Sequence, residues 1–129
     1  MIHFENKEGF CHSISLEKLA KEFGTPLFVY SAPLLRERCR DFKSAFADYP
    51  TLPFFAIKAN SNLTILKEVF AQGIGADVVS VGELERALMA GAKPENIVFS
   101  GVGKREDEIA RALEVGILCL NVESMEELP

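Results

Sequence analysis

The sequence has 129 residues, of which 48% are hydrophobic, and its 14 basic and 19 acidic side chains give a net charge of −5. This length allows one domain at most, and the apolar fraction is typical of a folded globular chain rather than a disordered one. The acidic balance lacks the basic footprint of a nucleic-acid-binding protein, so we expect no nucleic acid as a partner. No apolar run reaches the roughly 18 residues that a membrane-spanning helix needs, so we expect no membrane partner either.

The three cysteines are far apart in the sequence and form no C-x-x-C pair: Cys11, Cys39 and Cys119. This pattern indicates neither a zinc site nor a disulfide framework, so no metal is expected. The first ten residues also lack the charged-then-apolar layout of a signal peptide. We therefore predict a cytoplasmic protein with reduced thiols.

Short apolar runs typical of strands recur along the chain at intervals of about 20 to 27 residues: Leu27–Tyr30, Phe54–Ile57, Ala76–Val79, Ile97–Ser100 and Ile117–Leu120. Helical patterns precede them and fill the gaps between them: Leu16–Phe23, Pro33–Ala47, Asn62–Gln72, Gly82–Ala90 and Arg105–Val115. A glycine ends most of these helical patterns, where it accepts the left-handed conformation: Gly24, Gly73, Gly91 and Gly116. Capping boxes of the form Ser-x-x-Glu start helices at Ser80 and Ser124.

Alternating strands and helices at this spacing predict an α/β fold with a parallel sheet. The strands are mostly apolar throughout, as expected when both faces of a sheet are covered. An open doubly wound sheet and a (β/α)₈ TIM barrel both fit the spacing. A complete barrel needs about 250 residues, and this chain supplies about five of the eight units. Because the chain stops at Pro129, where a helix should begin, we interpret it as truncated.

Lys58 follows directly after the strand pattern that begins at Phe54, at the carboxyl end where parallel α/β folds place their functional groups. Strand alternation would place Lys58 on the same face as Ala56, a small residue that leaves room for a ligand. A desolvated lysine has a lowered pKa and can act as a nucleophile or form a Schiff base. A lysine at a strand end can equally extend into solvent. Position alone leaves both interpretations open.

Other polar residues near the predicted strand ends have weaker claims to a role. Asp77 lies within a strand and needs a cation, a ligand or backbone donors unless water reaches it. Glu83 is explained by the capping box that starts at Ser80. The loop 101–104, Gly-Val-Gly-Lys, could approach an anion but matches neither nucleotide-binding glycine motif, and an ordinary turn explains it as well. No role is assigned to His3 or His12.

Several motifs, in order, resemble the diaminopimelate decarboxylase family. They lie at residues 24–30 (GTPLFVY), 55–63 (FAIKANSNL), 75–84 (GADVVSVGEL), 97–104 (IVFSGVGK) and 120–124 (LNVES). The resemblance extends from about residue 10 to the end of the chain. Val81 stands where many members have glycine, and Phe55 replaces a common tyrosine.

The resemblance implies a fold type III enzyme with pyridoxal 5'-phosphate as cofactor and an N-terminal, alanine racemase-like (β/α)₈ barrel. This chain would be an incomplete barrel. The family's cofactor-linked lysine corresponds to Lys58, and its conserved aspartate near the cofactor corresponds to Asp77; we add Ala56 as a cofactor contact. Residues 1–12 would associate with a C-terminal β domain, and residues 13–129 would form part of the barrel. Further family groups, including a catalytic cysteine that is neither Cys39 nor Cys119, would lie beyond Pro129.

The implied activity is decarboxylation of meso-diaminopimelate to L-lysine, the last step of lysine biosynthesis, by a homodimer whose substrate is a small-molecule amino acid. We expect residues 1–129 alone to be inactive. Three alternatives stay open: an amino-acid racemase of the same fold, another basic amino-acid decarboxylase, and a non-catalytic pyridoxal-phosphate-binding or dimerisation fragment.

Overall fold

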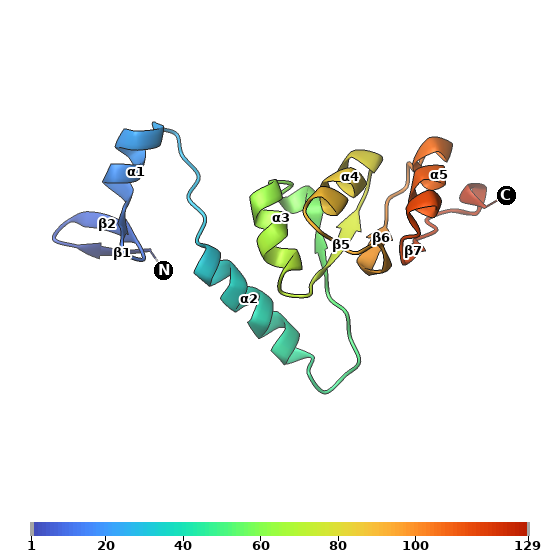
Figure 1. The fold of residues 1–129 in the computed structure, drawn as a ribbon, viewed down its shortest axis with the longest axis horizontal. Coiled ribbons are helices and arrows are strands. Elements are labelled where there is room, and N and C mark those ends of the chain that lie inside the picture. The colour runs from blue at the N-terminus through green and yellow to red at the C-terminus, as the bar shows by residue number, and fades with distance from the viewer. Residues whose placement is uncertain (1, 129) are drawn as a thin grey trace.

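The computed structural model describes residues 2–128, which fall into two regions (Figure 1). The first holds three short strands and helix α1 (Leu16–Phe23), the second holds helix α2 (Ala32–Ala45) and a parallel sheet with its helices, and an extended segment joins the two. In Figure 1 the strands of the first region and the chain's C-terminal end lie at opposite sides of the view. No helix in the described part of the chain is long and apolar enough to cross a membrane.

The N-terminal region contains an antiparallel sheet that the sequence analysis did not predict. Its strands are β1 (Ile2–Glu5), β2 (Glu8–Cys11) and β3 (Ile14–Ser15), hydrogen-bonded in that order. Asn6 and Lys7 join β1 to β2 with φ angles of 48° and 70°, the left-handed conformation of a tight hairpin turn. This turn lacks the Asn-Gly or Asp-Gly pair that identifies such hairpins, and β1 is exposed along its whole length, so no alternating pattern marks it.

The predicted strand Leu27–Tyr30 is wrong in this structure. The segment is extended, but among residues 2–128 its backbone makes no ladder hydrogen bond, and Phe28 is 84% exposed. A cavity of about 520 Å³, lined by Val29 and Tyr30 on one side and by Phe55 on the other, separates this segment from the parallel sheet. A strand forms only when a neighbouring strand shares its hydrogen bonds, and none is within reach here.

The parallel sheet has four strands: β4 (Phe54–Ala56), β5 (Gly75–Val78), β6 (Ile97–Phe99) and β7 (Cys119–Leu120). They pair in sequence order, β4-β5-β6-β7, so every crossover leads to the adjacent strand. The prediction of about five strand–helix units is thus one strand too high, while the four later strands are confirmed within two residues at each end.

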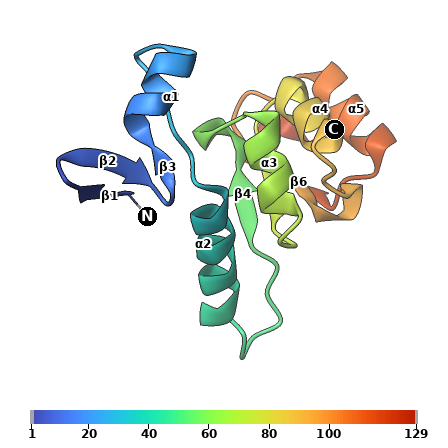
Figure 2. The same cartoon turned by 60° about the vertical axis from the view of Figure 1, so that its left-hand side comes forward.

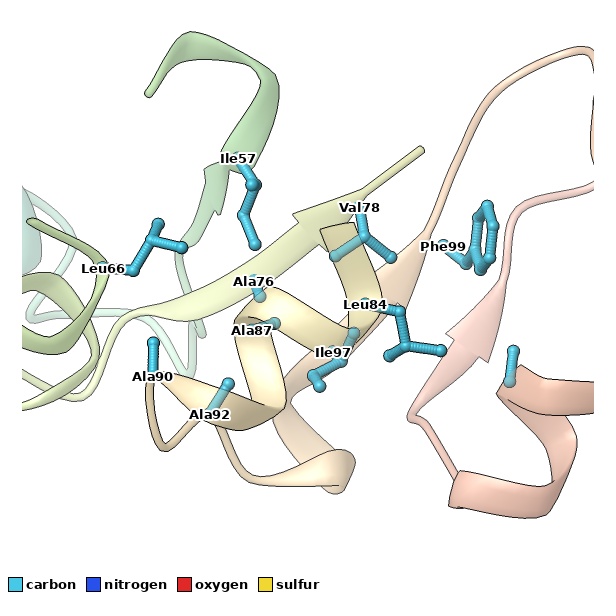
Figure 3. Close-up of a cluster of buried hydrophobic side chains, with 11 residues drawn as sticks. Ile57, Leu66, Ala76, Val78, Leu84, Ala87, Ala90, Ala92, Ile97 and Phe99 are labelled. Atoms are coloured by element: carbon cyan, nitrogen blue, oxygen red, sulfur yellow. The ribbon is translucent and has the colours of Figure 1, made fainter. Parts of the chain in front are cut away.

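Helices α3 (Leu63–Phe70), α4 (Val81–Met89) and α5 (Glu106–Val115) alternate with these strands and pack on one face of the sheet (Figure 2). The apolar core lies between that face and the helices (Figure 3). Its largest fully buried side chains are those of Phe99, Ile57, Leu66, Leu84, Ile97, Val69 and Val78. Helix α2 packs beside α3 and contributes no buried residue.

The two faces of the sheet differ sharply. On the helix-covered face, Ala76 and Val78 are fully buried. Asp77, which lies between them, points to the opposite face and is only half-buried, as are its register partners Ala56 and Val98. The expectation that both faces are covered is therefore wrong for the described residues. We call the second surface the open face.

The helix boundaries agree closely with the sequence analysis because local capping determines them. The side chains of Ser31, Asn62 and Ser80 each accept hydrogen bonds from backbone N–H groups in the first turn of α2, α3 and α4. At the other end of α5, Gly116 has φ 74° and ψ 47°, a left-handed conformation that glycine adopts without strain.

Candidate functional site

The carboxyl ends of β4 to β7 lie along one edge of the sheet because the strands are parallel. Polar residues gather at this edge: Lys58, Asp77, Ser100, Asn121 and the loop 101–104 all lie on or just after a strand. In parallel α/β folds this edge carries the functional groups, so it is the candidate site.

Lys58 is exposed at this edge, but strand alternation does not place it there. Strand β4 ends at Ala56, and the next residues form a 3₁₀ turn, Ile57–Ala59, which is closed by a hydrogen bond of 3.0 Å from the Asn60 N–H to the Ile57 carbonyl. Ile57 enters the core, where it is completely buried (Figure 3). In a turn with three residues per revolution the neighbouring side chain must point elsewhere, which leaves Lys58 in solvent.

Ala56 and Asp77 lie side by side on the open face, because they are Cα partners in the pairing of β4 with β5. Both are half-buried. The small methyl group of Ala56 leaves space on this face directly before the turn that presents Lys58. These three predicted site residues therefore come from two adjacent strand ends.

Asp77 has a partner of a different kind from those the sequence analysis considered. Its Oδ1 accepts a hydrogen bond of 2.7 Å from the Ser100 hydroxyl, and the Asn121 side-chain amide donates to the same hydroxyl oxygen at 2.9 Å. Sequence reasoning missed Ser100 and Asn121. Each directly follows a strand, β6 or β7, and this shared position was the signal that could have identified them.

Glu83 has the structural role that the capping box predicts, with one difference. Its backbone N–H donates to Ser80 Oγ at 3.2 Å, while its carboxylate accepts from the N–H of Val79 at 2.9 Å rather than from Ser80. The second predicted box, Ser124 with Glu127, does not form a side-chain cap; residues Met125–Glu127 make one 3₁₀ turn. Glu127 instead forms an ion pair with Lys104.

The loop 101–104 contacts anionic groups, as the sequence allowed, and these groups are carboxylates of the same chain. The Gly101 N–H donates to a carboxylate oxygen of Glu123 at 3.1 Å. The Lys104 ammonium lies 3.0 Å from Glu127 Oε2 and also donates to the Gly101 carbonyl. The Lys104 side chain is only 3% exposed, so this pair joins the loops after β6 and β7 in a nearly dry setting. Lys104 lowers the pKa of the Glu127 carboxyl below its usual range, chiefly through their hydrogen bond.

The histidines lie in the N-terminal region, away from the strand-end site, whereas Cys119 Sγ lies 4.0 Å from Asn121 Oδ1, to which it donates a weak hydrogen bond. His3 pairs with Glu5 and stacks on Phe10 in the N-terminal sheet, and His12 contacts the Ser31 hydroxyl at 2.5 Å. The cysteines are free thiols. Within residues 2–128 no group of three or more His, Cys, Asp or Glu side chains converges as a metal site would require.

Comparison with known proteins identifies the family to which this chain belongs. Residues 33–129 match the family described as pyridoxal-dependent decarboxylase, pyridoxal binding domain. A diaminopimelate decarboxylase of Pseudomonas aeruginosa is 49% identical over 125 residues, which are 97% of this chain and 30% of the relative. One from Vibrio cholerae is 48% identical over 124 residues, or 96% of this chain and 30% of the relative.

Solved structures agree. A protein of Aquifex aeolicus superposes with a TM-score of 0.94 at 45% identity, covering 98% of this chain and 31% of that one. The diaminopimelate decarboxylase of Helicobacter pylori in complex with L-lysine gives a TM-score of 0.83 at 47% identity, covering 87% of this chain and 28% of that one. This chain spans about 30% of the length of the curated relatives it matches.

These findings confirm both the resemblance and the fold class. The four parallel strands and their helices are the N-terminal portion of the (β/α)₈ barrel of fold type III enzymes, and the doubly wound alternative is excluded. The cofactor of the family is pyridoxal 5'-phosphate. The chain belongs to the family of pyridoxal-dependent decarboxylases, and its residues 33–129 match the pyridoxal binding domain of that family.

Proposed function

We propose that this chain is the N-terminal, cofactor-binding part of a diaminopimelate decarboxylase, a carboxy-lyase that converts meso-diaminopimelate to L-lysine. One observation carries the proposal: an exposed lysine, Lys58, stands at the carboxyl edge of the sheet within the region that matches the pyridoxal binding domain. The names of the relatives supply the substrate, because those compared above at 48% and 49% identity are diaminopimelate decarboxylases.

The residues at the edge fit pyridoxal phosphate chemically. The cofactor presents an aldehyde, which a primary amine attacks, and Lys58 supplies that amine in an accessible position. It has a flat ring, for which Ala56 leaves room on the open face. It also has polar ring substituents, to which the Asp77 carboxylate can bind. We assign Lys58 as the covalent attachment point and Ala56 and Asp77 as cofactor contacts.

Each residue then has a defined task. Lys58 Nζ would hold the cofactor covalently through its aldehyde carbon, with release of water, and the amine of the incoming amino acid would displace Lys58 as a free amine. Asp77, held by the Ser100 hydroxyl, keeps a negative charge at a set position beside Ala56. When bound, the cofactor supplies an electron sink that stabilises the negative charge left on the substrate carbon after carbon dioxide leaves. The groups that bind the phosphate and the ring nitrogen would come from the part of the relatives that this chain does not span.

Covalent trapping tests the attachment point. The 129-residue chain is incubated with pyridoxal phosphate, reduced with borohydride, digested and mapped by mass. We expect the pyridoxyl mass on Lys58 and its loss in Lys58→Ala. The matched control is Lys67→Ala, which removes a different lysine that lies on α3. This variant should keep the label on Lys58. Label scattered over surface lysines, or absent, would show that these residues do not form the attachment site.

Product formation tests the reaction. The full-length protein should release carbon dioxide and L-lysine from meso-diaminopimelate, Lys58→Ala should abolish both, and residues 1–129 alone should be inactive. A racemase of the same fold would interconvert enantiomers without releasing carbon dioxide. Another basic amino-acid decarboxylase would prefer L-ornithine or L-lysine as substrate. A non-catalytic fragment would bind the cofactor, and the amino acid would not change its absorbance.

The remaining expectations belong to the same proposal. We assign residues 1–12 to a β domain and residues 13–129 to the barrel, supported by the antiparallel pairing of β1 with β2 apart from the parallel sheet. Strand β3 (Ile14–Ser15) pairs with β2 across this boundary. We assign the working form as a homodimer in the cytoplasm, where the free thiols would stay reduced. Sedimentation of the full-length protein, with and without cofactor, tests the dimer.

A further inference from the structure

Three side chains form a directional hydrogen-bond chain across three adjacent strands. Ser100 Oγ lies 2.7 Å from Asp77 Oδ1, and Asn121 Nδ2 lies 2.9 Å from Ser100 Oγ. An ionised carboxylate can only accept, so the single hydroxyl proton of Ser100 must point to Asp77. The hydroxyl oxygen then has only lone pairs left, and Asn121 must approach it with its NH₂ group. The chain therefore runs from Asn121 through Ser100 to Asp77.

Backbone hydrogen bonds fix the positions of Ser100 and Asn121. The Ser100 N–H donates to the Val78 carbonyl at 2.8 Å, and the Asn121 N–H donates to the Phe99 carbonyl at 2.8 Å. These bonds continue the β5-β6-β7 pairing one residue past each strand. Phe99 is completely buried under the helices (Figure 3), so the next side chain, that of Ser100, alternates to the open face. A rigid ladder rather than a flexible loop thus sets where the hydroxyl lies.

The hydrogen bonds from Asn121 through Ser100 to Asp77 leave one carboxylate oxygen of Asp77 available. Among residues 2–128, Oδ2 of Asp77 has no hydrogen-bond partner, while Oδ1 is held by Ser100. A carboxylate with one oxygen anchored has lost the freedom to rotate about its last bond. Its other oxygen therefore has a defined direction, which is what a contact to a bound cofactor requires.

We propose that Ser100 and Asn121 are positioning residues: they orient the Asp77 carboxylate so that its free oxygen binds pyridoxal phosphate on the open face. The inference rests on the proposed function and extends it to two side chains that reach Asp77 directly or through one further hydrogen bond. Ser100 acts by donating a hydrogen bond to the Asp77 carboxylate. Asn121 acts one step further away, by ensuring that this proton has no competing acceptor.

Removal of the hydroxyl tests the first step. In the full-length protein, Ser100→Ala should raise the dissociation constant for pyridoxal phosphate about ten-fold and lower kcat about ten- to a hundred-fold. The KM for meso-diaminopimelate and the melting temperature should change little, because the backbone ladder stays. Ser100→Thr keeps a hydroxyl and should restore both quantities. Ser44→Ala, an exposed serine on α2, is the control and should match the wild type.

A double-mutant cycle shows whether Ser100 acts through Asp77. In an Asp77→Ala background, where the Ser100 hydroxyl has no side-chain acceptor at position 77, Ser100→Ala should cause no further loss of cofactor affinity, whereas independent roles would give additive losses and overturn the proposal. Asn121→Asp tests the direction. The new carboxylate competes for the Ser100 proton, so Asn121→Asp should weaken cofactor binding more than Asn121→Ala does. Equal effects would contradict the directional chain.

Two readouts separate this inference from the proposed function. A wild type that binds pyridoxal phosphate but does not decarboxylate meso-diaminopimelate would overturn the proposed substrate. The inference would still be supported if Ser100→Ala weakened cofactor binding. A wild type that is fully active, with Ser100→Ala unchanged in cofactor affinity and in kcat, would overturn the inference alone.

Discussion

Glu108 is a buried carboxylate that joins the N-termini of two helices, α4 and α5. It accepts hydrogen bonds from the Val81 N–H at 2.9 Å and from the Arg105 N–H at 3.2 Å, and it is only 4% exposed. Two first-turn donors that no helical carbonyl can satisfy are thereby paired. Its negative charge also suits the positive ends of both helices. Sequence analysis cannot single it out, because Glu106 and Asp107 beside it suit the helix start equally well.

The first prediction concerns removal of this charge. Glu108→Gln keeps the shape, but only its carbonyl oxygen can accept, so one buried N–H loses its partner. The free energy of unfolding should fall by about 1–3 kcal/mol, measured from the urea midpoint at constant slope. Glu106→Gln, at an exposed position in the same turn, should lose less than about 1 kcal/mol. Equal losses in the two variants would contradict the role assigned to Glu108.

The second prediction follows from the pKa of the same group. The hydrogen bond from the Val81 N–H, more than any other interaction, lowers the pKa of Glu108 below its ordinary value of 4.5. A lowered folded-state pKa means that the stabilisation is complete above about pH 4.5 and is lost as the pH falls through the folded-state pKa. The stability difference between wild type and Glu108→Gln should therefore be constant near neutral pH and shrink in acid. A constant difference down to pH 3 would contradict this.

At the scale of elements, the Lys104–Glu127 pair joins the loop after β6 to the last 3₁₀ turn, Met125–Glu127. The Lys104 side chain is 3% exposed and that of Glu127 is 12% exposed, so neither charge has much water. One carboxylate oxygen, Oε1 of Glu127, is buried without a hydrogen bond. The pair is thus strongly interdependent: each charge is tolerated only because the other is there.

The third prediction is that breaking this pair costs more than deleting it. Lys104→Met should lower the free energy of unfolding, because it leaves the Glu127 carboxylate without its cation. The double variant Lys104→Met with Glu127→Leu should recover most of that loss, as a double-mutant cycle in urea would measure. Arg38→Met removes the exposed partner of Asp41 and should cost less than about 1 kcal/mol. A double variant as unstable as Lys104→Met would contradict the interdependence.

The fourth prediction concerns helix α2. It contributes no buried residue and touches the rest of the sheet region chiefly through α3, where Arg36 pairs with Glu68 at 2.7 Å. In α4, by contrast, Leu84 and Ala87 are completely buried. Local opening is easiest where little apolar surface is buried. Amide hydrogens in α2 should therefore exchange faster than those in α4, as mass spectrometry of exchanged peptides can show. Equal protection would mean that α2 opens only with the whole sheet.

Local sequence signals decide which helices and strands could be predicted from the sequence. Helices and the later strands follow from local signals: caps such as Ser80 and Asn62, glycines such as Gly116, and apolar spacing. Long-range pairing has no such signal. The pattern of Leu27–Tyr30 predicts a strand, but this segment pairs with no other strand among residues 2–128. No strand was predicted for β1 to β3, yet they pair with one another.

The candidate site divides in the same way. The position of Lys58 at the carboxyl edge was predictable from the strand before it, whereas the 3₁₀ turn that orients it was not. Ser100 and Asn121 become recognisable only when the register brings β6 and β7 beside Asp77. Their roles depend on neighbours that lie more than 20 residues away in sequence.

At the scale of the whole molecule, the described residues leave much apolar surface in water. Phe4, Phe28, Val102 and Met125 are 75%, 84%, 86% and 77% exposed, and side chains on the open face of the sheet are only half-buried. A folded monomer rarely exposes apolar area on this scale, because such patches associate. The relatives are about three times as long as this chain. In the relatives, we expect the additional residues to cover the surface that corresponds to this one.

The fifth prediction is that the isolated 129-residue chain binds an apolar dye and self-associates, whereas the full-length protein does not bind the dye. Sedimentation velocity should show a concentration-dependent shift to larger species, because association buries the exposed side chains at about 25 cal/mol per Å². Phe28→Asp should weaken this self-association without unfolding the chain, since Phe28 is 84% exposed. Phe99→Asp, which places a charge in the core, should unfold it. A chain that stays monomeric at every concentration and binds no dye would show that the exposed apolar surface does not drive association.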